Sequence, residues 1–202
     1  KDRVVGFFTG ARKEAPPQFR RFIEEHGNKK IDSIIICRSP IQSYINYFLN
    51  FITFGKFEEA LKSLDYDKLF HLYMIIVLDD NTSFRIEKNE VVKVEMTYEG
   101  CNDFVSAPIT YPIKVIDFFE NGIKQQPEDF FLYNAKNNNC QVFITSLLNG
   151  NNINTPKINN FVKQDAISIF QQMPEYAEKV SNFITDLGAR FDIIRQGNGF
   201  VM

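Results

Sequence analysis

The sequence predicts an α+β fold, in which an antiparallel β-meander packs against a helix that carries a cysteine, with extra N-terminal and C-terminal helices. Two observations predict it: strand-like segments follow one another between residues 69 and 98, and segments with helical spacing of apolar residues flank them. The 202 residues are 44% hydrophobic and 24% charged, which is typical of a globular chain with a sizeable core.

The meander is predicted from three segments. Residues 69–78 (LFHLYMIIVL) form the most strand-like segment, and the Asp79-Asp80-Asn81-Thr82 sequence that follows is typical of a turn. Residues 83–88 return as the second arm of a hairpin, and residues 90–98 alternate between apolar and polar side chains. Residues 31–37 add a short buried strand, and residues 100–112 are expected to be loop or edge.

Helices are predicted from capping signals and apolar spacing. Pro17 suits a first helical turn and Gly27 suits its C-terminal cap, whereas Ser39-Pro40 is expected to open a helix that runs to Phe54. Further helical segments are expected at residues 57–64, 115–119, 127–133, 140–148, 158–171 and 174–195. We expect a single domain with a helical extension at 1–65, a core at 66–150 and a second helical extension at 151–202.

Cys140 is the main candidate for chemistry. Asn139 is a suitable N-cap for a helix that begins at Cys140, and the first turn of a helix stabilises a thiolate through its N–H groups and dipole. A nucleophilic cysteine also needs a base, and His71 lies near the start of the strongest strand, where its ring would be held in place. His26, the other histidine, ends a surface helix, so Cys140 and His71 form the best candidate dyad.

A third residue would orient the imidazole of His71, and the next strand should supply it. A simple hairpin register through the predicted turn places Glu90 opposite His71. A one-residue bulge would bring Glu87 or Asn89 onto that face instead.

These residues resemble a known superfamily. Residues 70–75 (FHLYMI), 85–90 (RIEKNE) and 138–143 (NNCQVF) look like the circularly permuted, papain-like NlpC-type superfamily, whose relatives include the lecithin:retinol acyltransferase-like enzymes. The resemblance covers about residues 69–148. It implies a permuted papain-like fold with Cys140 as nucleophile and His71 as base, and it favours Glu87 as the third residue. The acyltransferase branch often has a second histidine on the following strand, and this sequence has none there.

Two hypotheses about function follow. The first is a cysteine-dependent hydrolase or acyltransferase, of the amidase or peptidase kind, which acts on a peptide, amide or acyl substrate without a metal or organic cofactor. The Cys140 N–H would hold the oxyanion, and Gln141 and Asn139 would support it. The second is a catalytically silent structural or interaction protein built on the same fold, such as a component of a virus particle. Large apolar additions at both ends of the core favour it, because they enlarge the surface available for assembly. Similar chains occur in large DNA viruses and related mobile elements.

Composition excludes several other classes. The net charge of −2 gives no electrostatic reason to expect nucleic acid as a partner, and the sequence has no glycine-rich phosphate loop and no apolar run of membrane-spanning length. The three widely spaced cysteines, without a CxxC pair, predict neither a structural zinc site nor a disulfide framework. We therefore expect reduced thiols in an intracellular compartment such as a host cytoplasm, or packaging in a virus particle, with membrane binding disfavoured.

Overall fold

The computed structural model describes residues 15–40, 70–88, 91–132 and 139–163, and all structural statements below concern these residues. The helices predicted at 41–54, 57–64 and 174–195, and most of the one at 158–171, lie outside them. The chain divides into two compact units, of which the second comprises Pro40–His71, Asn134–Asn137 and Gln164–Met202. The division into two units does not test whether the chain folds as a single domain, so that expectation stays a prediction.

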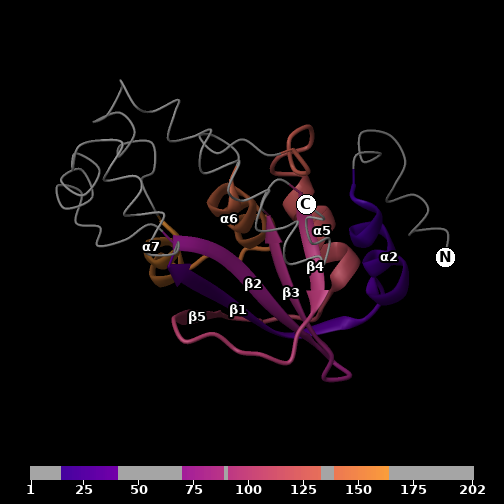
Figure 1. Ribbon diagram of the computed structural model, residues 1–202, viewed down its shortest axis with the longest axis horizontal. Helices are drawn as coiled ribbons and strands as arrows, with labels where there is room; N and C mark the ends of the chain where they lie inside the picture. Colours follow the sequence, from indigo (N-terminus) through magenta and orange to yellow (C-terminus); the bar gives the residue numbers. More distant parts are fainter. Residues whose placement is uncertain (1–14, 41–69, 89–90, 133–138, 164–202) are drawn as a thin grey trace, which may run out of the picture. The chain divides into compact units, whose positions relative to one another are not determined.

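Six described strands form one antiparallel sheet, which confirms the α+β class and the meander. Their order is β4-β3-β2-β1-β5, and β6 pairs with the start of β1 (Figure 1). The strands are β1 (Lys30–Pro40), β2 (Phe70–Leu78), β3 (Ser83–Lys88), β4 (Val92–Met96), β5 (Phe104–Ala107) and β6 (Ile113–Lys114). The expected helix start at Ser39-Pro40 is wrong, because both residues belong to β1.

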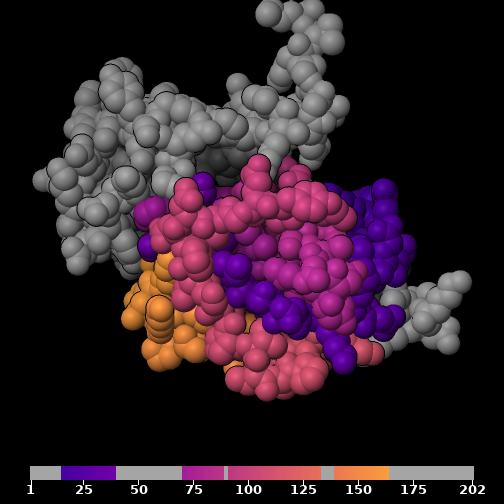
Figure 2. All heavy atoms as spheres, turned by 90° about the horizontal axis from the view of Figure 1, so that it is seen from below, coloured from indigo at the N-terminus to yellow at the C-terminus, as the bar shows by residue number. Residues whose placement is uncertain are grey.

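Four described helices accompany the sheet: α2 (Pro17–His26), α5 (Val115–Ile123), α6 (Cys140–Gly150) and α7 (Pro156–Val162). Pro17 begins α2 and Gly27 is its C-cap, as predicted. The helical segment predicted at 127–133 is wrong, because residues 127–131 form turns. Segments far apart in the sequence meet on one face of the molecule, where residues 15–40 lie beside residues of β5 and its neighbours (Figure 2).

Alternation along the strands gives the sheet two different faces. One face contributes its aliphatic side chains to the main hydrophobic core, together with buried residues of all four helices. We call it the helix-covered face. The other face carries a small cluster of Cys37, Tyr73 and Ile75, and we call it the disulfide face. Each strand residue therefore belongs to one of two environments according to its position in the alternation.

Helices α5 and α6 approach one another unusually closely. An added Cβ at Gly150 would lie 2.3 Å from the carbonyl oxygen of Asn121, and one at Gly122 would lie 2.6 Å from Cδ2 of Leu147. The fully buried side chain of Asn151 ties the two helices, because its Nδ2 donates to the carbonyl oxygens of Phe118 (2.9 Å) and Leu147 (2.8 Å). Gly150 is therefore required by this contact, not merely by the end of a helix.

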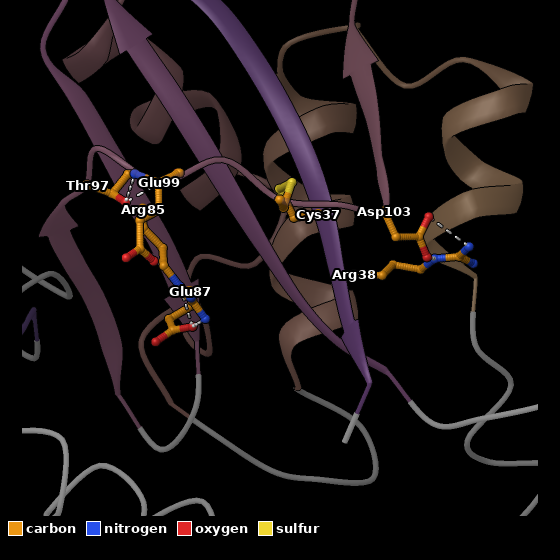
Figure 3. Close-up of a disulfide and its surroundings, with 8 residues drawn as sticks. Cys37, Arg38, Arg85, Glu87, Thr97, Glu99 and Asp103 are labelled. Carbon is orange, nitrogen blue, oxygen red and sulfur yellow. Dashed lines mark hydrogen bonds and ion pairs between the residues drawn. A yellow bond between two sulfur atoms is a disulfide. The ribbon is translucent and has the colours of Figure 1, made fainter. Parts of the chain in front are cut away.

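The structure also corrects the expectation of three reduced thiols. Cys37 of β1 forms a disulfide with Cys101 in the loop before β5, with Cα atoms 6.1 Å apart (Figure 3). Sequence spacing could not reveal this pair, because 64 positions separate the two residues and only the sheet brings them together. Cys140 is the free thiol of the described residues. No described helix has the length and apolar character needed to cross a membrane.

Replacing Gly150 with Ala should destabilise the protein by about 1–3 kcal/mol, because the new methyl group would collide with backbone atoms that cannot rotate away. Gly100→Ala is the matched control, since nothing lies within 4 Å of its added Cβ, and its effect should stay within about 0.5 kcal/mol. Urea denaturation monitored by circular dichroism measures both. Equal midpoints for the two variants would contradict the close approach of α5 and α6.

Removing the disulfide should also destabilise the fold. The crosslink closes a long loop, so Cys37→Ala with Cys101→Ala should lower the free energy of unfolding by about 4 kcal/mol in the chain-entropy estimate. The wild type in reducing agent should behave like the double variant. A thiol titration of the unfolded, unreduced chain checks the premise: one reactive thiol is expected, and three would show that the bond does not form.

Candidate functional site

Cys140 is the first residue of α6, as the sequence predicts. The side-chain oxygen of Asn139 accepts hydrogen bonds from the backbone N–H groups of Gln141 (3.0 Å) and Val142 (3.3 Å). The carbonyl oxygen of Asn139 accepts the first helical bond, from the N–H of Phe143. The predicted N-cap is thus confirmed, and it fixes the thiol at the positive end of the helix dipole.

The thiol of Cys140 is half-buried and packs against the core of the helix-covered face. Partial exposure leaves it accessible to a reagent or a substrate. The backbone N–H of Gln141 is used by the Asn139 cap, so that group is not aimed at an oxyanion here. The N–H of Cys140 itself is the donor that the oxyanion hypothesis retains.

Lys88 lies at the same helical turn, and the sequence interpretation assigned it no role. Its side chain is fully buried on the helix-covered face, where it pairs across the sheet with Val92. Its Nζ lies 5.8 Å from the ring centroid of Phe143 and 3.4 Å from the carbonyl oxygen of Asp129, to which it donates. Phe143 follows Cys140 by three positions, so the two share one side of α6.

Burial lowers the pKa of Lys88 to about 8, because removing an ammonium group from water disfavours its charged form. The negative charges of Asp129 and of ionised Cys140 oppose this shift and favour the ammonium. The electrostatic link between Lys88 and Cys140 works in both directions, so a charged Lys88 equally favours the thiolate. Shifted pKa values of this kind cluster at functional sites, which makes Lys88 and Cys140 a candidate site.

His71 and Glu87 belong to the opposite side of the sheet by alternation. Tyr73 pairs with Glu87 across the β2–β3 hairpin, and residues 71, 73 and 87 therefore share the disulfide face. Cys140 packs against the helix-covered face. The hairpin thus groups His71 with Glu87, and the pairing of His71 with Cys140 stays a prediction.

The register that placed Glu90 opposite His71 is wrong by one residue, since it would pair Tyr73 with Lys88. The reason lies in the turn. Leu78 N–H donates to the carbonyl oxygen of Thr82, so the loop contains three residues, and Asn81 adopts a left-handed φ of 66°. Asn89 and Glu90 lie outside the described residues.

The disulfide face carries a charged cluster that sequence reasoning missed. The guanidinium of Arg85 stacks over the ring of Tyr73 (3.8 Å to its centroid), and its Nη2 lies 2.6 Å from Oε2 of the buried Glu87. Figure 3 shows this ion pair and the disulfide over the same sheet. In the sequence, the alternate positions 85, 87, 93 and 95 are all charged, and this pattern could have predicted the cluster. Arg85 holds the carboxylate of Glu87 in one orientation.

The described part of the chain contains no group of three or more His, Cys, Asp and Glu side chains that could hold a metal ion. Comparisons with protein-family models, curated proteins and solved structures found no match for this chain. Arguments about function therefore depend on the geometry at Cys140 and its neighbours.

Replacing Asn139 with Ala should lower the stability by about 1 kcal/mol, because two N–H groups of α6 lose their acceptor. Asn139→Asp is the informative partner variant. Its carboxylate keeps the cap, so stability should stay near that of the wild type, but its negative charge should raise the pKa of the Cys140 thiol. Thermal unfolding and the pH profile of thiol alkylation measure the two effects. A wild-type alkylation profile in Asn139→Asp would contradict this arrangement.

Proposed function

We propose that this protein is a cysteine-dependent hydrolase or acyltransferase in which the thiolate of Cys140 attacks an acyl or amide carbonyl carbon. One observation carries the proposal: a half-buried thiol begins an Asn-capped helix, and a fully buried lysine lies against the same turn. The helix dipole and the ammonium both lower the free energy of the thiolate, which is the nucleophilic form.

The proposed reaction has two halves. The Cys140 sulfur forms a bond to the carbonyl carbon, and the carbonyl oxygen becomes an oxyanion that the Cys140 N–H stabilises. The proposal assigns the base to His71, which would first accept the thiol proton and then donate it to the leaving amine or alcohol. For this step the imidazole, at the start of β2, must reach the helix-covered face. Water or a second nucleophile then releases the acyl group and regenerates the thiol.

The resemblance to the permuted NlpC-type superfamily belongs to the same proposal. The observed antiparallel meander precedes the cysteine helix in the chain, which is the order that the resemblance requires. A papain-like permuted fold, a peptide, amide or acyl substrate, and a place inside a virus particle or an infected cell are its further consequences.

A structural or interaction role is the competing proposal. It is favoured by exposed apolar side chains at and just after the edge strand β4, where Met96 is 53% exposed and Tyr98 is 93% exposed. An edge strand with such neighbours suits contact with another chain. Reactivity at Cys140 distinguishes the two proposals.

The test is the pH dependence of iodoacetamide alkylation at Cys140, measured by peptide mass spectrometry on the folded, unreduced protein. The disulfide protects Cys37 and Cys101, so neither needs replacement. We expect an apparent pKa well below the ~8.5 of a free thiol, and a higher value in His71→Ala.

His26→Ala is the matched control, because it removes the other histidine and should leave the profile unchanged. An inert Cys140 that reacts only after unfolding would refute the catalytic proposal and leave the interaction role. A low pKa that His71→Ala does not change would keep the nucleophile and remove His71 as its base.

A further inference from the structure

Burying the ammonium group of Lys88 costs desolvation free energy, and its neighbours within the sheet are apolar. Its neighbours on the helix-covered face of β3 and β4 are Ile86, Val92 and Val94, all buried and apolar. Burial removes the hydration of an ammonium group, and the Nζ of Lys88 donates a hydrogen bond to the carbonyl oxygen of Asp129 (3.4 Å). An apolar side chain of the same length would fill the space without this cost.

We propose that Lys88 is a positioning residue that holds Cys140 as a thiolate, and this inference rests on the function proposed above. The Nζ of Lys88 lies 5.8 Å from the ring centroid of Phe143, which follows Cys140 by three positions and lies on the same side of α6. On ionisation the thiol proton passes to the proposed base, and Lys88 keeps its own three protons. Lys88 then acts by its charge alone and transfers no proton during the reaction.

Among the described residues, two negative groups act on Lys88: the carboxylate of Asp129, in the turns before α6, and ionised Cys140 of α6. From the adjacent strands, Met74 and Val92 on the helix-covered face do not titrate. Asp129 opposes the thiolate, so Lys88 is the group among the described neighbours that favours it.

The pKa of about 8 of Lys88 sets the upper pH limit of the proposed pair. Below that pH the ammonium is present and can favour a thiolate at Cys140. Above that pH, Lys88 loses its charge and no longer stabilises the thiolate. Between about pH 8 and 10.5, Lys88 is protonated in the unfolded chain and largely neutral in the folded one. Its burial therefore lowers the free energy of unfolding at neutral pH, and this destabilisation decreases as the pH rises through that range.

The test compares alkylation of Cys140 in the wild type, Lys88→Met and Lys93→Met. Met has an unbranched side chain one atom shorter than that of Lys and carries no charge. Lys93 is also buried, on the disulfide face of β4 where it pairs with Glu87, so it controls for loss of a buried charge elsewhere in the sheet. We expect Lys88→Met to raise the apparent pKa of Cys140 and to slow alkylation at pH 7 by about tenfold or more, whereas Lys93→Met leaves both near wild type.

A reciprocal measurement covers the case in which Lys88→Met fails to fold. Cys140→Ser keeps the size of the side chain and removes the thiolate, so the pKa of Lys88 should fall in this variant. Lysine titration followed by NMR of ¹³C-labelled side chains measures it. An unchanged Lys88 pKa, or an alkylation profile of Lys88→Met that superimposes on the wild type, would overturn the inference while a reactive Cys140 upholds the proposed function. A wild-type Cys140 that is inert would overturn both.

Discussion

The contact between α5 and α6 is the constraint on which the candidate site depends. Two glycines let the helices approach until an added methyl group at Gly150 would overlap backbone atoms, and the buried Asn151 amide binds both helices. Buried apolar residues then hold α6 on the sheet. Since α6 begins at Cys140, the position of the thiol follows from packing at the other end of the helix, not from the residues around the thiol.

The hairpin between β2 and β3 distributes the charges of the site. Alternation sends Lys88 to the helix-covered face, and it sends Glu87, the adjacent residue, to the disulfide face. A change of one residue in the register would exchange these two environments. The three-residue loop that ends at Asn81 therefore decides which charge lies near α6, although it is remote from Cys140.

Local signals predicted what local interactions determine. The Asn139 cap, the start of α2 at Pro17 and the three strands of the meander all depend on residues close in the sequence, and each was predictable. The disulfide and the burial of Lys88 depend on residues brought together from distant segments, and periodicity contains no information about them. Ser39-Pro40 misled because a helix-opening pair also suits the end of a strand, where proline's missing N–H costs little.

The buried lysine links stability to the proposed chemistry. If a charge at position 88 only filled space, an uncharged side chain would serve better, because burial disfavours the ammonium at neutral pH. A thiolate beside it changes that balance: each charge compensates part of the desolvation of the other, and the dipole of α6 favours the thiolate alone. The same burial that makes Lys88 a poor structural residue makes its charge more effective, because a charge in a protein interior is screened less than one in water. The free-energy cost of burying Lys88 is therefore lowest when Cys140 is ionised, as the proposed nucleophile would be.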